Sequence, residues 1–189
     1  MSTFSNPAGA AAAAAQRYTN ALLAVLGDRD PLAVMGELVP WLDQHVRGPD
    51  EARLRRPEQP GKWSVLEVVQ HLADTELVYG YRVRMILTQD TPPIPGYDQD
   101  AWAREFRYRD LPVGEALAQV GALRAANLRL YRSLGPGQLR RAGLHAERGP
   151  ESVEHVLRMI GAHDLVHRRQ IERILAAGPE GSPPFAEPR

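Results

Sequence analysis

Two histidines stand in an apolar run near the C-terminal end of the chain, in the sequence IGAHDLVHRRQI at residues 160–171. His163 and His167 are four positions apart, a spacing that puts both side chains on one face of a helix with their Cβ atoms about 6 Å apart. Two imidazoles so placed can bind one metal ion. Both belong to the inward stripe of the expected helix, which consists of Val153, Val156, Ile160, His163, His167, Ile171 and Ile174.

A metal site of this kind needs a third ligand from another helix, and His71 in VVQHLADTE is the best candidate because it shares an inward stripe with Val68. Three neutral imidazoles around one divalent ion leave a coordination position for water or substrate, as in catalytic zinc sites. Ligation by histidine alone suits zinc, nickel, copper or iron. The alternative is two core histidines that are hydrogen-bonded across a helical bundle, and the spacing does not decide between these interpretations.

Further polar residues near these histidines are candidates for catalysis. Asp74 and Glu67 lie one turn on either side of His71. Either carboxylate could accept the second N–H of a ligand histidine, as is usual around metal sites. Asp74 could instead be the catalytic general base beside a metal-bound water. Glu67 also fits a simpler role, as the last residue of a helix-capping motif.

Four residues are candidates for substrate binding. Arg124 and Asn127 fall on the inward stripe of a helix, where they could hold a substrate carboxylate or form a buried structural network. Arg82 lies further along the His71 stripe, with the same two interpretations. His145, in the loop sequence GLHAERGP, could approach the open face of the metal site or be an exposed loop residue.

Helical spacing dominates the chain, and the local signals place the ends of the helices. A first helix is expected over 10–26, before Gly27. Asp30 is a good N-cap with Pro31 at the first helical position, but Pro40 should break or kink this segment, and a second short helix should run to about His45.

The three longest helices have clear boundaries. Ser64 and Glu67 form a capping box, which predicts a helix from 65 to about 87. A second helix begins at Pro112 or Val113 and runs to about Leu134, and the last is capped by Ser152 and ends at 177. With the N-terminal helical unit they predict an all-α four-helix bundle.

A long proline-rich connection, TQDTPPIPGYDQDAWAREFRYRD, joins the second and third helices of this bundle. Connections of that length in a compact domain are often functional. Tyr97, Asp98 and Trp102 could form a wall over the metal site, or Trp102 could only anchor the connection against the bundle.

Composition narrows the possible functions. The 189 residues are enough for one domain. Lys+Arg and Asp+Glu both number 23, so the balanced charge argues against nucleic-acid binding. The chain has no cysteine, which excludes a cysteine nucleophile and thiolate ligands. No apolar run reaches the roughly 18 residues of a membrane span, and no signal peptide is visible, so we expect a cytoplasmic protein that does not bind membranes.

The chain resembles the DinB/YfiT-like family of metal-dependent enzymes over roughly residues 30–176. The resemblance rests on PGKWSVLEVVQHLADTE, YRVRMIL, PPIPGYDQDAW, LRAANLRLYRSL and HAERGPESVEHVLRMIGAHDLVHRRQI. Its most specific element is one histidine on the second bundle helix with H-x-x-x-H on the fourth. The chain is therefore expected to consist of an Ala-rich helical extension (1–29), the bundle (30–177) and a tail (178–189) whose composition predicts disorder.

The resemblance implies an up-down-down-up helix order, with a long crossover between the second and third bundle helices, and a divalent ion, zinc or nickel, on His71, His163 and His167. It further implies that the protein acts on a small-molecule substrate and forms a homodimer. The implied activity is either that of a transferase that uses a low-molecular-weight thiol or that of a hydrolase. The alternative is a non-catalytic metal-binding bundle involved in stress response.

Overall fold

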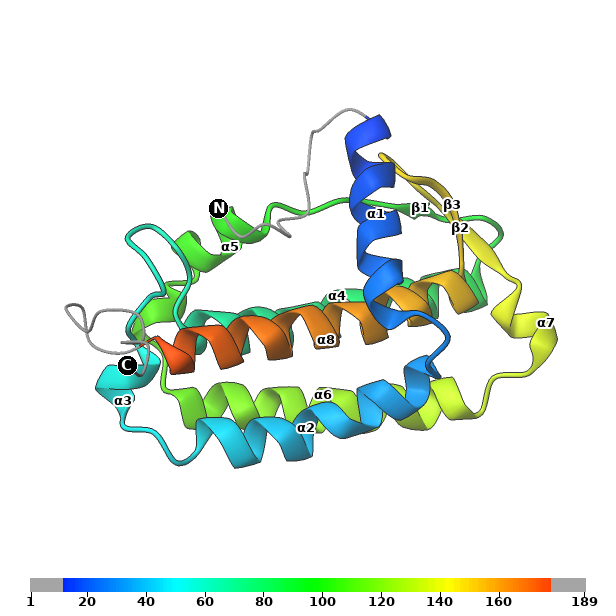
Figure 1. Ribbon diagram of the computed structural model, residues 1–189. Helices are drawn as coiled ribbons and strands as arrows, with labels where there is room; N and C mark the ends of the chain where they lie inside the picture. Colours follow the sequence, from blue (N-terminus) through cyan, green and yellow to red (C-terminus); the bar gives the residue numbers. More distant parts are fainter. Residues whose placement is uncertain (1–11, 178–189) are drawn as a thin grey trace, which may run out of the picture.

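Four long helices form the bundle: α2 (Pro31–Val46), α4 (Val65–Thr88), α6 (Val113–Arg132) and α8 (Val153–Ala176). The computed structural model describes residues 12–177. In it, α2 and α4 each pack against both α6 and α8, so α2 and α4 lie diagonally opposite one another (Figure 1). The predicted four-helix bundle is therefore present.

The helix starts follow from side-chain caps, as the sequence predicts. Ser64 and Glu67 form the capping box of α4, in which the Ser64 backbone N–H donates to Glu67 Oε2 at 2.8 Å and the Glu67 N–H donates to Ser64 Oγ at 3.3 Å. Asp30 caps α2 and Ser152 caps α8 in the same way. These bonds satisfy N–H groups that have no partner within the helix.

The predicted break at Pro40 is wrong, because α2 continues through this residue to Val46. An internal proline removes one backbone hydrogen bond and costs about 3 kcal/mol. Leu38, Trp41 and Leu42, on both sides of Pro40, are buried, and each such side chain contributes about 1.5–3 kcal/mol. Packing of both halves on the same core outweighs the cost.

An additional helix, α1 (Ala12–Leu26), packs against α8 on the outside of the bundle (Figure 1). Its Leu22 and Leu26 are 1% exposed and pack with Val34, Met159 and neighbouring residues. The helix ends where Gly27 takes a φ of +59°, which favours glycine. The first residues of the extension and the predicted tail at 178–189 lie outside the described residues.

A small sheet corrects the all-α prediction. The segment expected to be a polar loop forms an antiparallel hairpin of β2 (Ala142–His145) and β3 (Gly149–Ser152), and β1 (Pro93–Ile94) pairs with β2 in parallel. Gly143 permits this pairing, because a Cβ there would lie 2.8 Å from the Ile94 side chain. Strands of two to four residues are too short to show the alternation that identifies a strand.

The crossover between α4 and α6 carries β1, then α5 (Gln99–Glu105) and the 3-10 turn η1 (Tyr108–Asp110), and lies along the bundle (Figure 1). Asp98 caps α5 through its carboxylate. Trp102 packs between Tyr97 and Phe106, with ring centroids 4.7 and 5.3 Å away. Two short helices complete the chain, α3 (Glu51–Leu54) before α4 and α7 (Pro136–Leu139) after α6.

Besides the cluster under α1, the core of the bundle consists of two apolar clusters with a polar layer between them. One cluster gathers Val68 and Leu72 of α4 with Ile171 and Ile174 of α8, and the other gathers Tyr79 and Val83 of α4 with Val156 and Ile160 of α8. The turns of the helices between these clusters carry buried polar side chains instead. They are His71, Thr75, Glu76, Arg124, Asn127, His163, Asp164, His167 and Gln170.

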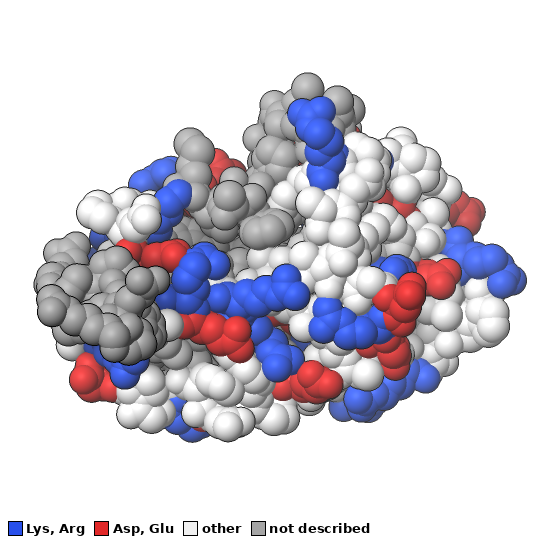
Figure 2. All heavy atoms as spheres, viewed as in Figure 1, with Lys and Arg blue, Asp and Glu red and all other residues white. Residues whose placement is uncertain are grey.

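On the face shown in Figure 2, basic and acidic side chains lie in small interspersed groups. This arrangement fits the zero net charge of the chain. Among the described residues, none of the helices combines the length and the apolar character needed to cross a bilayer.

Candidate metal centre

The three histidines of the polar layer meet in the middle of the bundle. His71 comes from α4, and His163 and His167 come from consecutive turns of α8. Their exposed fractions are only 1%, 7% and 2%. The Nε2 atom of His163 lies 3.0 Å from Nε2 of His71 and 3.0 Å from Nε2 of His167. The predicted convergence of these side chains is therefore present.

Hydrogen bonds alone cannot satisfy this arrangement. The His163 Nε2 atom is either one N–H donor or one lone pair, so it can form one good hydrogen bond, yet two other ring nitrogens lie 3.0 Å from it. His167 Nδ1 lies 2.8 Å from Gln170 Oε1. Because the Gln170 oxygen is an acceptor, His167 carries its proton on Nδ1 and presents a lone pair at Nε2.

A shared ion fits the same geometry. One ligand atom from each of the three histidines lies within 4.8 Å of the others. With imidazole nitrogens about 2.1 Å from a tetrahedral zinc ion, ligand nitrogens lie about 3.4 Å apart, close to the observed separations. Within residues 12–177, these three histidines are the only group of His, Cys, Asp or Glu side chains with this proximity.

The electrostatic environment keeps the histidines neutral. Burial lowers the pKa of His71 and His163 well below the ordinary value, and the charge that His167 would carry lowers both further. Burial lowers the pKa of His167 to about 4, although its hydrogen bond with Gln170 acts in the opposite direction. Only the neutral ring binds a metal ion, so at pH 7 the cluster is ready to bind one.

The three histidine rings differ in the hydrogen-bond partners of their Nδ1 atoms. The Gln170 side chain contacts Nδ1 of His167 and so fixes the orientation of this ring. In the described part of the chain, the buried Nδ1 atoms of His71 and His163 have no hydrogen-bond partner. Thr75 Oγ1 is 3.4 Å from His71 Nε2, so the Thr75 hydroxyl lies next to the nitrogens of the histidine cluster.

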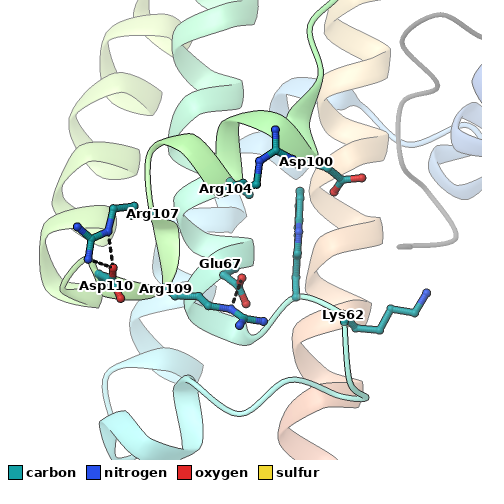
Figure 3. A pocket seen from close by; sticks show the side chains of 10 residues that line it. Lys62, Glu67, Asp100, Arg104, Arg107, Arg109 and Asp110 are labelled. Carbon is teal, nitrogen blue, oxygen red and sulfur yellow. Dashed lines mark hydrogen bonds and ion pairs between the residues drawn. The ribbon is translucent and has the colours of Figure 1, made fainter.

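Trp63 separates the His71 ring from a surface pocket. The two ring centroids are 4.9 Å apart, and Trp63 also lines a pocket of 460 Å³ between the start of α4 and the crossover. Figure 3 shows the charged residues of this pocket, among which Arg109 pairs with Glu67 and Arg107 with Asp110. Its mixed charge resembles the rest of the surface.

Glu67 and Asp74 do not contact a ligand histidine in the way the sequence suggested. The Glu67 carboxylate accepts hydrogen bonds from Ser64 and Arg109. Asp74 is half-buried and accepts a hydrogen bond from the Tyr108 hydroxyl of the crossover. Burial raises the pKa of Asp74, and the Tyr108 hydrogen bond partly offsets this. A catalytic role for Asp74 stays a prediction.

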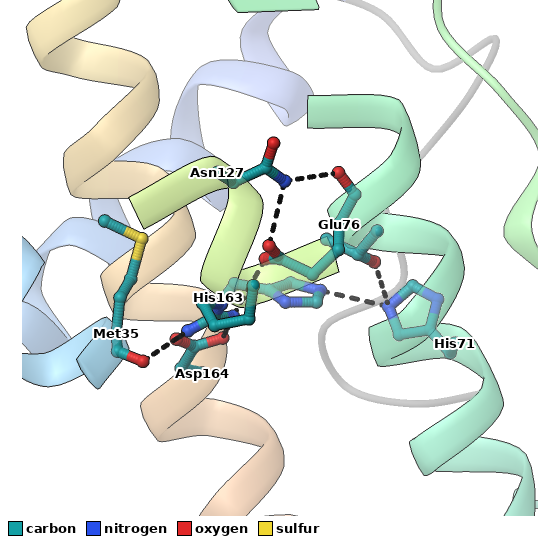
Figure 4. Close-up of polar contacts among 8 residues, drawn as sticks. Met35, His71, Glu76, Asn127, His163 and Asp164 are labelled. Atoms are coloured by element: carbon teal, nitrogen blue, oxygen red, sulfur yellow. Dashed lines mark hydrogen bonds and ion pairs between the residues drawn. The ribbon is translucent and has the colours of Figure 1, made fainter. Parts of the chain in front are cut away.

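Arg124 and Asn127 belong to a buried network beside the three histidines, and Figure 4 shows its members Asn127, Glu76 and Asp164. The Arg124 guanidinium donates to both oxygens of Asp164, at 2.6 and 2.9 Å, and pairs with Glu76 at 2.9 Å. Asn127 donates to the Glu76 carboxylate at 3.0 Å. These contacts form the buried structural network that was one of the two interpretations of the sequence. Substrate binding by Arg124 and Asn127 stays a prediction.

Arg82 lies further along α4, and His145 lies on β2 of the hairpin, which packs against α4. Arg82 is 3% exposed and donates to the Pro95 carbonyl of the crossover. His145 is 1% exposed, so the interpretation as an exposed loop residue is wrong. The hairpin fold explains the difference, because β2 pairs with both β1 and β3 and its His145 side chain faces inward.

Three functional candidates were missed by sequence reasoning. Glu76 occupies a buried position one turn from Leu72 and Tyr79 on α4, and a lone acid among apolar residues was a usable signal. Gln170 follows His167 by three residues on the same helix face, a spacing that lets its side chain hydrogen-bond to the histidine ring. Thr75 carried no signal of its own apart from lying four residues after His71.

Comparison with known proteins gives a consistent result. Residues 41–171 match the family model of the DinB superfamily. The chain is 32% identical over 110 residues to a protein of Oceanobacillus iheyensis, a match covering 57% of this chain and 63% of the relative. It is 30% identical over 116 residues to a protein of Bacillus subtilis, covering 61% and 65%. The name of each includes "Putative metal-dependent hydrolase".

A solved structure resembles the fold. It is that of YfiT from Bacillus subtilis, described as "a probable metal-dependent hydrolase with an unusual four-helix bundle topology". The TM-score is 0.72 at 28% sequence identity, and the match covers 76% of this chain and 83% of YfiT.

Proposed function

Because the chain belongs to the DinB superfamily, we propose that it is a metal-dependent hydrolase whose divalent ion, zinc or nickel, is bound by His71, His163 and His167. The observation that carries the proposal is the convergence of three neutral, buried imidazole nitrogens within 4.8 Å. The names of the relatives support the reaction class.

A divalent ion at this position would supply Lewis acidity and lower the pKa of a bound water or thiol. The residues of the chain supply the rest. Gln170 holds the His167 ring so that its Nε2 lone pair faces the other ligands. Thr75 places a hydroxyl beside His71. Asp74 is proposed as the general base, because its raised pKa makes the carboxylate a better proton acceptor.

The same centre could carry out a thiol transfer in place of hydrolysis. The chain has no cysteine, so the thiol would come from a low-molecular-weight cosubstrate. A non-catalytic metal-binding protein is the remaining alternative. Three protein ligands favour catalysis over that role, because structural zinc sites are closed by a fourth protein ligand.

We also propose the up-down-down-up order for the bundle helices. The crossover supports it, since it carries the chain along the bundle between α4 and α6 (Figure 1). Neighbouring helices joined by such a connection run parallel, whereas a short loop would make them antiparallel.

The test begins with elemental analysis of protein purified without a histidine tag, where about one zinc or nickel ion per chain is expected. The metal-loaded protein is then assayed with chromogenic esters, amides and phosphate esters, and separately with thiols plus an electrophile. Hydrolysis that is lost in His163→Ala and reduced in Asp74→Asn at unchanged metal content supports the proposal. Activity in the thiol assay alone would assign a transferase, and a chain that binds no divalent ion would refute the metal centre.

A further inference from the structure

Three buried nitrogen-bearing side chains gather where the hairpin meets the crossover: Arg82, His145 and Arg148. Their side chains are 3%, 1% and 3% exposed. One nitrogen of each, namely Arg82 Nη1, His145 Nε2 and Arg148 Nη1, is buried and has no hydrogen-bond partner within residues 12–177. Buried polar atoms are almost always hydrogen-bonded, so three in one region call for an explanation.

The contacts of the three residues meet at His145. The Arg148 backbone N–H donates to His145 Nδ1 at 3.4 Å. Ile94 of β1 pairs with His145 of β2, and the next residue, Pro95, accepts a hydrogen bond from Arg82 Nη2. The three side chains are therefore brought together by the β1–β2 pairing.

His145 is an N–H donor in this cluster. Its Nδ1 atom accepts backbone hydrogen bonds from Glu147 and Arg148 at 3.2 and 3.4 Å, so the proton of the neutral ring is on Nε2. The ring is neutral at pH 7, because burial and the positive charge of Arg148 lower the pKa of His145 to about 4. The cluster thus presents an imidazole N–H beside two guanidinium N–H groups.

Arg148 has a carboxylate partner and Arg82 does not, and the Glu147 carboxylate, whose Oε2 atom is buried, also lies near His145. Arg148 pairs with Glu151, which is also 3% exposed, at 2.5 Å. Arg82 has no ion pair with a carboxylate in the part of the chain that the structure describes. Its guanidinium lies 5.1 Å from the Tyr79 ring and 5.9 Å from the Tyr97 ring. A buried guanidinium without a carboxylate is costly unless an anion compensates it.

We propose that Arg82, His145 and Arg148 form a binding site for a carboxylate or phosphate group. Guanidinium forks match the geometry of both anions. A pocket of 590 Å³ lies between residues 93–95 of the crossover and 144–149 of the hairpin, and of the three side chains His145 lines it.

This inference rests on the proposed function in one respect, since the anion would be one end of the substrate. Eleven residues of α4 separate His71 from Arg82, which is about 16 Å along the helix. Between them lies Tyr97, whose pKa is raised by burial, with the nearby Thr75 side chain acting in the opposite direction, and whose ring faces Arg82. The substrate is then an elongated small molecule with an anionic group at the hairpin and its reacting bond at the metal centre.

The test uses the full chain, made metal-free with a chelator, because phosphate would also bind to a metal ion. Calorimetric titrations are performed with inorganic phosphate and with succinate, at an ionic strength held constant with potassium chloride. We expect wild type to bind at least one of the two anions and Arg82→Gln to weaken that binding about tenfold or more. Arg82→Lys should be intermediate, because it keeps the charge and loses the fork.

Two further variants complete the experiment. Arg129→Gln, at an exposed arginine of α6, should bind the anions as wild type does. His145→Gln should weaken binding less than Arg82→Gln, since it removes no charge. Circular dichroism checks folding, and if Arg82→Gln is unfolded, Arg82→Lys and His145→Gln carry the comparison.

The inference is overturned if wild type binds neither anion, or if the Arg82 and His145 variants bind them as wild type does. Selective binding of phosphate or of succinate would support the site and identify its anion. Zinc titration of the same metal-free protein tests the proposed function separately, and Arg82→Gln should keep the zinc-induced rise in melting temperature. Loss of one response with the other intact shows which proposal has failed.

Discussion

Two buried polar clusters adjoin one another on α8, where His163 and Asp164 are consecutive residues. In the Arg124 cluster, charges of opposite sign meet and the carboxylates of Asp164 and Glu76 are both engaged. In the histidine cluster, three nitrogens of the same kind face one another, and hydrogen bonds cannot satisfy them all (Figure 4). Burial of polar groups is common to both. The difference is that the chain itself supplies the opposite charges of the first cluster, whereas the three nitrogens of the second would be satisfied by the proposed ion.

Acid should have the largest effect, because it acts on three histidines together. Their folded-state pKa values are lowered below 6.5 by burial, so their contribution to stability is present above pH 6.5 and is lost as the pH falls through the folded-state values, about 4 for His167. Asp164 acts in the opposite direction, since burial raises its pKa to about 6. His145, whose pKa is lowered to about 4, acts with the three histidines, and Asp74, whose pKa is raised, acts with Asp164. With two groups against four, metal-free protein should lose stability steadily between pH 6.5 and 4.

Urea denaturation at several pH values measures this loss. His167→Gln removes one of the titrating groups, so its stability should depend less steeply on pH than that of wild type. Identical slopes for the two proteins would contradict the assignment of neutral buried histidines.

Removing Arg124, the cation of the Arg124 cluster, should have the next largest effect on stability. Arg124→Met leaves the carboxylates of Asp164 and Glu76 buried without their partner, which should cost about 3–5 kcal/mol of unfolding free energy. Arg129→Gln, on the exposed face of the same helix, should change stability by less than about 0.5 kcal/mol. Equal losses in urea denaturation would show that the Arg124 ion pairs contribute nothing particular.

Adding a metal ion tests the difference between the two clusters, because only the histidine cluster should respond to the ion. Zinc or nickel at a hundred times its dissociation constant should stabilise wild type by about 2.7 kcal/mol, seen as a higher melting temperature. His163→Ala should abolish this rise, and His45→Ala, outside the site, should retain it. A rise that survives in His163→Ala would place the ion elsewhere.

The smallest effects are expected where α4 and α6 approach most closely. Gly80→Ala would put a Cβ 2.6 Å from the Asn127 side chain and displace it from Glu76, at a cost of about 1–3 kcal/mol. Gly121→Ala meets its nearest atom at 3.9 Å, so its better helix propensity should stabilise by up to about 1 kcal/mol. Thermal denaturation should show melting temperatures that shift in opposite directions.

The features that the sequence predicted are those with a local cause. The caps at Asp30, Ser64 and Ser152 set helix starts through contacts within three residues. The spacing of His163 and His167 put both rings on one face. For His71, spacing indicated only a candidate third ligand, and the resemblance to a family implied that it is one.

The features that escaped prediction depend on distant parts of the chain. β1 pairs with a strand about fifty residues later, Pro93 lying opposite Leu144, and two residues cannot show a pattern. Glu76 becomes a partner of Arg124 only when α4 and α6 pack. Pro40 remains helical because tertiary burial on both sides exceeds a local cost. In each of these cases packing decides the outcome, and propensity does not.

The polar layer between the two apolar clusters also fixes the axial register of the bundle. Helices held only by apolar stripes can slide past one another by a turn and still bury similar surfaces. A slide of α8 by one turn, about 5.4 Å, would carry Asp164 away from Arg124 and His163 away from His71, and would press apolar side chains against Glu76. Alternative alignments of the same four helices are therefore penalised, and one polar layer makes this arrangement unique.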